Sequence, residues 1–117
     1  MKTKKICLIY KKKKIEFDVK ECNFFETGRG LTFRFRKKAP ALLFNQWRRG
    51  SMALTALFVF FPFLVLWIDN NKILEIKRVK PFTFLIDSKT DYSKIIEIPI
   101  NKKYKEIISL LVEGRKV

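Results

Sequence analysis

The stretch MALTALFVFFPFLVLWI, from Met52 to Ile68, holds 17 residues without a single charge, and its conformation decides the fold. A helix needs about 20 apolar residues to span the hydrocarbon core of a bilayer, so the stretch is at the short edge of that range. It is crowded with aromatic and β-branched residues, which favour strands. Pro62 would interrupt a helix but fits between two strands or at a bulge. We therefore expect a buried central strand, with a transmembrane helix flanked by Arg48 and Arg49 as the alternative.

At residues 15–19 and 31–36, apolar and polar residues alternate with a period of two, which is typical of strands with one face in water. The expected strands are residues 6–10, 15–19, 31–36, 73–79, 82–86 and 94–98, with a short apolar piece at 41–44. The lysines from Lys11 to Lys14 would connect the first two strands as a hairpin. Asp69 to Lys72 predicts a second hairpin turn, because Asp and Asn favour tight turns.

Two helical segments are expected. Asn23 can cap a short helical turn that Gly28 or Gly30 ends, since glycine adopts positive φ without steric cost. Asn101 can cap a C-terminal helix that Gly114 would end. One face of that helix carries apolar residues at i, i+3, i+4 and i+7, which are Tyr104, Ile107, Ile108 and Leu111. With twelve Phe residues in 117, the sequence predicts a single mainly β domain over residues 1–117 with a small α component.

The positive charge is large and uneven. The net charge is +15; residues 1–49 hold 15 Lys/Arg and 4 Asp/Glu, a net of +11, and the remaining residues hold 11 and 7, a net of +4. Such a field attracts nucleic acid, anionic lipid or an acidic protein, but it can also serve solubility alone. The candidate binding residues are Arg29, Arg34, Arg36, Lys37, Lys38, Arg48 and Arg49. Arginines next to aromatic residues suit nucleic acid, yet the same alternation describes an ordinary strand with its phenylalanines in the core.

The sequence lacks the usual equipment of catalysis. It has no histidine, the commonest general base and zinc ligand. Cys7 and Cys22 are expected to be small reduced core residues, although a bridge between them stays open. The acidic residues fall mostly at alternating wet positions or in predicted turns. Gly28, Arg29 and Gly30 lack the rest of a nucleotide-binding fingerprint. We therefore expect no enzymatic activity, no metal site and no cofactor.

Several motifs, in order, resemble those of the domain-of-unknown-function 192 family. Residues 29–34 are similar to its Gly-Leu-Met-x-Arg signature, and residues 42–44 resemble its Met-Leu-Phe. Residues 62–69, the later part of the apolar run from Phe58, resemble its Pro-Leu-Asp-x-x-Phe-x-Asp strand, with the proline and the final aspartate in place. Residues 95–99 resemble its Leu-Glu-Leu-x-Ala-Gly segment, and residues 112–117 resemble its Gly-Asp-x-Val ending.

The resemblance covers residues 15–117 and implies a compact, barrel-like mixed sheet, but no activity, since the family is uncharacterised. The departures from its pattern are Thr32 for methionine, Leu64 for the aspartate after the proline, Asn101 near a glycine and Arg115 for the last aspartate. If the family binds a ligand through the strand aspartate, this chain has lost or changed that site at Leu64.

These observations favour a non-catalytic β domain of unknown activity that binds a ligand or partner as an accessory protein. The alternative is a basic β barrel that binds nucleic acid, and the third reading is a protein associated with a membrane through residues 52–68. The apolar piece Ile6 to Tyr10 is too short for the core of a signal peptide, so we expect a cytoplasmic protein.

Overall fold

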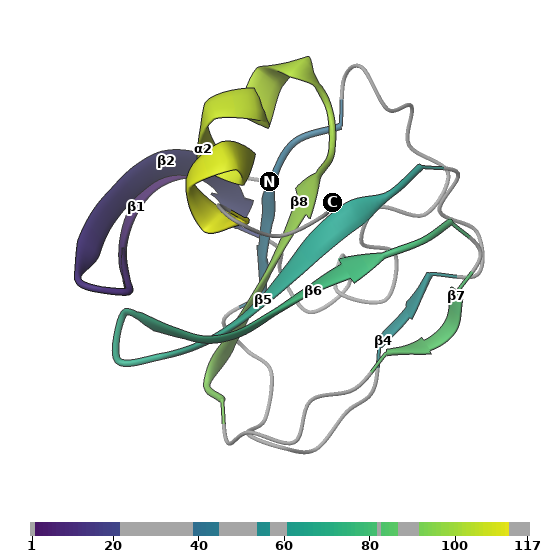
Figure 1. Ribbon diagram of the computed structural model, residues 1–117, viewed down its shortest axis with the longest axis horizontal. Coiled ribbons are helices and arrows are strands. Elements are labelled where there is room, and N and C mark those ends of the chain that lie inside the picture. Colours follow the sequence, from purple (N-terminus) through teal and green to yellow (C-terminus); the bar gives the residue numbers. More distant parts are fainter. Residues whose placement is uncertain are drawn as a thin grey trace.

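A computed structural model describes residues 2–21, 39–44, 54–56, 61–81, 83–86 and 92–112 of the chain (Figure 1). Its elements are β1 (Lys2–Tyr10), β2 (Lys13–Glu21), β3 (Leu42–Phe44), β4 (Leu54–Ala56), β5 (Phe63–Asp69), β6 (Lys72–Val79), β7 (Thr83–Ile86), β8 (Lys94–Pro99), the 3₁₀ helix η1 (Lys102–Tyr104) and α2 (Lys105–Leu111). The predicted helical turn from Asn23, the predicted strand 31–36 and Gly114 lie outside these residues.

Six strands close into a barrel in the order β1-β2-β3-β8-β5-β6, and β4 pairs with β7 in a separate two-stranded sheet. The barrel is mixed: β2 runs parallel to β3 and β1 parallel to β6, whereas its other neighbours are antiparallel. The expected fold class, a mainly β barrel-like mixed sheet with a C-terminal helix, is confirmed.

The charge-free stretch forms strands on either side of its proline. Leu54–Ala56 is β4 in the small sheet, and β5 begins directly after Pro62. β5 pairs with β6 along one edge and with β8 along the other, so it is a central strand of the barrel. All residues from Phe63 to Ile68 are buried, as the sequence predicted. Among the described residues, no helix is both long and apolar enough to cross a bilayer.

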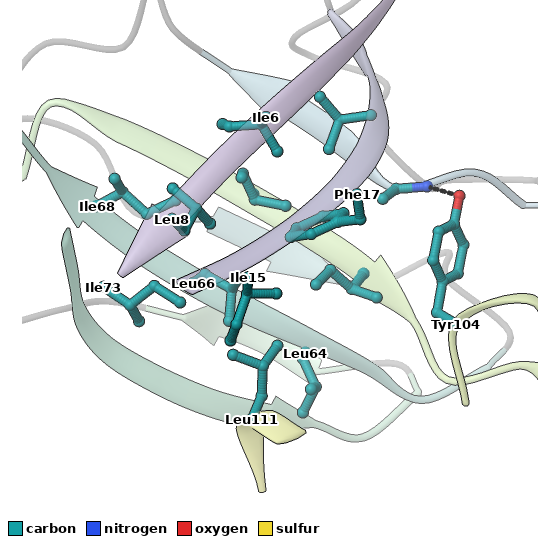
Figure 2. Close-up of a cluster of buried hydrophobic side chains, with 14 of the residues drawn as sticks. Ile6, Leu8, Ile15, Phe17, Leu64, Leu66, Ile68, Ile73, Tyr104 and Leu111 are labelled. Carbon is teal, nitrogen blue, oxygen red and sulfur yellow. Dashed lines mark hydrogen bonds between the residues drawn. The ribbon is translucent and has the colours of Figure 1, made fainter. Parts of the chain in front are cut away.

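β5 is apolar throughout because both of its faces are covered. Its even-numbered residues, Leu64, Leu66 and Ile68, join the cluster inside the barrel, to which β1, β2, β8 and α2 also contribute (Figure 2). Its odd-numbered residues, Phe63, Val65 and Trp67, join a second cluster on the outer face. A strand buried on both sides reads as a continuous apolar run rather than as an alternating one, which explains why this segment resembled a membrane span.

The C-terminal helix covers the inner cluster, and one hydrogen bond fixes its start. Tyr104, Ile108 and Leu111 pack into that cluster, as their spacing predicted. The buried hydroxyl of Tyr104 accepts a hydrogen bond from the backbone N–H of Ala41, at 2.6 Å (Figure 2). The predicted capping role of Asn101 is wrong for its side chain. Its Nδ2 donates instead to the backbone carbonyl of Ala39, at 3.2 Å. This hydrogen bond links the start of η1 to the residues just before β3.

Both predicted hairpins are present, with two-residue turns. Lys11 and Lys12 have φ of 50° and 67°, and Asn70 and Asn71 have φ of 51° and 63°. Positive φ at both turn residues matches the right-handed twist of the flanking strands. The first connection is shorter than expected, since Lys13 and Lys14 already belong to β2. Asn enters this left-handed region readily, whereas Lys does so only at a cost.

Candidate anion-binding surface

The tips of the two hairpins meet. The backbone N–H of Ile9 donates to the carbonyl of Asn71, at 2.8 Å, and Ile9 pairs in parallel with Lys72. In Figure 1 both tips lie at the left of the view. Backbone pairing therefore brings the lysines of the first turn next to the second turn, although about 60 residues of sequence separate them.

We call the lysines at this meeting point the basic corner; they are Lys11, Lys12, Lys13, Lys14 and Lys72. The segments 11–14 and 69–72 hold five lysines and one aspartate, a net charge of +4. All five lysines are exposed. Lys14 and Lys72 are both register partners of Ile9, on the strands to either side of it. Register partners point to the same face of a sheet, so these ammonium groups share the outer face of the barrel.

Described carboxylates near the corner include Asp69, the register partner of Lys72, and Glu16. The Nζ of Lys14 lies 3.7 Å from Oε1 of Glu16, with side chains 69% and 47% exposed. Such an exposed pair contributes only about 0–1 kcal/mol and holds its charges loosely. The Nζ of Lys11 lies 5.4 Å from the centre of the Tyr10 ring, a cation–π distance that leaves the charge uncompensated.

Farther from the tips, the positive charge is more evenly balanced. On the outer face of the first hairpin, Lys5 is opposite Asp18 and Cys7 is opposite Glu16. On β6, the Nζ of Lys77 lies 3.3 Å from Oε2 of Glu75. A second group of exposed lysines, Lys102, Lys103 and Lys105, lies on η1 and the start of α2. The described charge is thus partly scattered and partly concentrated, and its densest concentration is the basic corner.

Two exposed apolar side chains lie beside the corner. Ile9 is 44% exposed, between Lys14 and Lys72. Leu74 is 42% exposed and lies two residues after Lys72 on β6. Ile68 pairs with Ile73 and Trp67 with Glu75, so Leu74 is the extra residue of a β-bulge, which re-aims side chains at this point.

The seven candidate arginines and lysines of the sequence analysis, Arg29, Arg34, Arg36, Lys37, Lys38, Arg48 and Arg49, lie outside the described residues. The structure therefore leaves their placement open. The basic corner was visible in the sequence only as a lysine run in a hairpin loop. Lys72 could not be joined to it, because no periodicity predicts which two hairpin tips meet.

The expectation that acidic residues lie in wet positions or turns is wrong for Glu97. This residue is 5% exposed and lies in the middle of β8. Its register partners are Leu42 and Val65, which belong to the outer cluster. Among the described residues, Glu97 is the one charged residue that is buried. Its neighbours in the sequence, Ile96 and Ile98, point to the opposite face of the strand and join the inner cluster, so they gave no signal for its burial.

The described residues include no group of three His, Cys, Asp or Glu side chains that could hold a metal ion. Cys7 is a free thiol, so the bridge to Cys22 is not formed. It is half-buried on the outer face opposite Glu16, rather than in the core as expected. Cys22 itself lies outside the described residues.

No protein-family model matches the sequence, and no curated protein matches it. The fold is similar to that of a solved structure, a protein of unknown function from Novosphingobium aromaticivorans. The TM-score is 0.64 at 11% sequence identity, over 90% of this chain and 78% of the other. At this identity the likeness concerns the fold alone, and it agrees with the barrel described above.

Proposed function

We propose that this chain is a non-catalytic binding domain that holds an anionic partner against the basic corner. One observation carries the proposal: two hairpin tips, hydrogen-bonded to one another between Ile9 and Asn71, gather five exposed lysines at one place. Backbone pairing fixes the position of these charges before a partner arrives. Preorganised charge of one sign raises the rate of encounter with a partner of opposite sign.

The absence of histidine from the sequence supports a role in binding rather than in chemistry, because it removes the commonest general base. Nucleic acid, anionic lipid and acidic proteins are all partners of suitable charge. We further propose the cytoplasm as the compartment, which the free thiol of Cys7 supports, because thiols persist in reducing surroundings.

The test compares two variants of equal charge. The corner variant replaces four lysines of the basic corner with glutamine: Lys11, Lys12, Lys14 and Lys72. The control variant makes the same replacement at Lys80, Lys102, Lys103 and Lys105, which are also exposed. Both changes lower the net charge from +15 to +11, because four positive charges are removed. Fluorescence anisotropy of labelled duplex DNA and of labelled heparin is measured over a range of salt concentrations.

The corner variant should lose affinity for the polyanions, and its salt dependence should weaken by roughly one unit of slope for each contacting lysine removed. The control variant should retain both the affinity and the slope of the parent. Equal losses in the two variants would show that net charge alone drives the binding, and would refute a site at the corner.

We also propose that the chain is a divergent member of the domain-of-unknown-function 192 family. Three features support this: Pro62 immediately precedes β5, Asp69 ends it, and Glu97 lies within β8, as the family's motif order requires. A crystal structure of a family member with the complete motif tests the assignment. It should show the same strand order, with its aspartate at the place of Leu64.

A further inference from the structure

We infer that the anionic partner is a phospholipid surface, on which the barrel docks with its basic corner among the headgroups and with Ile9 and Leu74 inserted. This inference rests on the proposed function and names its partner. It concerns peripheral binding by the hairpin tips. The third reading of the sequence, attachment through residues 52–68, does not fit the structure from Phe61 onward, because Phe61 and the whole run from Phe63 to Ile68 are buried in the protein.

The first support is the position of the exposed apolar residues. Among the described residues, three large hydrophobic side chains are exposed: Ile9 at 44%, Leu74 at 42% and Leu110 at 42%. A single exposed hydrophobic residue is ordinary. Two of these three, however, lie on strands β1 and β6, which meet at the corner. Lys72 is the register partner of Ile9 and lies two residues before Leu74 on β6. Exposed lysines and exposed apolar side chains therefore lie within a few residues of one another at the corner.

The second support is chemical. Membrane-surface elements combine lysines, which contact anionic headgroups, with aliphatic or aromatic side chains that enter the acyl boundary. A nucleic-acid duplex offers phosphates but leaves Ile9 and Leu74 in water. An unpaired strand needs an aromatic surface on which its bases stack. The described aromatic residue of the corner, Tyr10, packs against the inner cluster and carries Lys11 over its ring, so this ring is not an open stacking surface.

The third support is the short length of each turn. Both turns have two residues, and the hydrogen bond from Ile9 to Asn71 joins them. The bulge in β6 turns Leu74 outward at the same place. A two-residue turn has few conformations to lose, so each tip avoids most of the ordering cost that a long loop meets on binding. Each lysine near an anionic surface raises the partition coefficient roughly fivefold, so a few lysines and two shallow apolar insertions give reversible binding.

Sedimentation of sucrose-loaded vesicles tests the inference, with phosphatidylcholine alone and with phosphatidylcholine containing a minority of phosphatidylserine. The parent protein should partition onto the anionic vesicles and remain in solution with the neutral ones. The double variant Ile9→Ser with Leu74→Ser keeps every charge and should lower the partition coefficient by about tenfold, since two apolar side chains no longer enter the bilayer. The matched control is Leu110→Ser, which removes an equally exposed leucine from α2 and should bind as the parent does.

Thermal melting of each variant establishes that it is folded, which is expected because the replaced side chains are exposed. The corner variant should also lose vesicle binding, whereas the control charge variant should keep it. Vesicle binding that is indifferent to the two serines overturns the insertion of Ile9 and Leu74. Binding to duplex DNA or heparin that requires the corner lysines, without binding to anionic vesicles, overturns the lipid partner and leaves the proposed function standing. If the corner lysines matter for neither polyanions nor vesicles, both proposals are wrong.

Discussion

Leu64 is one of the residues that fill the interior of the barrel. Its side chain is fully buried between the strands of the inner cluster, and its register partner on β8, Ile98, is fully buried as well. A carboxylate at this place would lie in an apolar interior. The leucine at this position contributes packing to the inner cluster.

The change Leu64→Asp should destabilise the fold by at least about 3 kcal/mol, since it removes an apolar contact and buries an unpaired carboxylate. Urea denaturation at neutral pH measures the loss. The control is Leu74→Asp, at the exposed bulge residue, whose effect should stay within about 0.5 kcal/mol. Similar unfolding free energies for the two variants would contradict the placement of Leu64 inside the barrel.

For single residues, the sequence predicted the burial of apolar side chains well, but it did not predict the burial of a charged one. The burial of Leu64 follows from its place in an uninterrupted apolar strand. The burial of Glu97 does not, because it depends on residues that reach its face from β3 and β5, such as Leu42 and Val65. Strand pairing between distant segments sets the surroundings of a side chain, and periodicity within one segment does not report it.

Among the elements, the first hairpin carries a conformational cost at its turn. Lys11 and Lys12 occupy the left-handed region, with φ of 50° and 67°, where the second hairpin uses two asparagines. Lysine disfavours this region because its Cβ approaches the backbone, by about 1–2 kcal/mol per residue. Under the proposed function, these two lysines serve binding at a cost in stability, as functional residues often do.

Replacing the turn by Lys11→Asn and Lys12→Gly should therefore stabilise the protein by about 1 kcal/mol or more, because this pair is the preferred one for a two-residue hairpin turn. Differential scanning calorimetry should show a higher Tm. The same variant should bind anionic vesicles more weakly, because two lysines of the basic corner are gone. The reciprocal control, Asn70→Lys with Asn71→Lys, should lower the Tm. An unchanged Tm in both variants would contradict the positive φ angles of the two turns.

The hairpins were predictable because each is local: alternating strands flank a short polar segment. The division of the charge-free stretch was partly predictable, since Pro62 marked a place between two strands. The pairing of β4 with β7 was not, because it joins segments about 30 residues apart that no local signal connects. The same limit applies to the basic corner, of which the sequence supplied the lysine run but not its neighbour Lys72.

At the scale of the whole molecule, neighbouring strands of the barrel differ widely in the number of residues that they pair. β5 is paired along its full length with β6 and β8, from Phe63 to Asp69 and from Phe63 to Ile68. The β1–β2 hairpin joins the rest through two register pairs with β3 and through one with β6, between Ile9 and Lys72. Among the described strands, the hairpin thus has the fewest backbone links to the rest of the barrel. Its contact with β6 lies at the basic corner.

Native-state hydrogen exchange should report this difference. Local opening takes less free energy where fewer hydrogen bonds and contacts must break, so the amide of Ile9 should exchange faster than that of Val65 in the central strand. A partner that bridges the two tips binds the closed contact between β1 and β6 better than the open one, and linkage then stabilises the closed form. Addition of anionic vesicles or heparin should therefore slow the exchange of Ile9 and leave Val65 unchanged. Slowed exchange in the α2 region, with none at Ile9, would place the partner on the second lysine group instead.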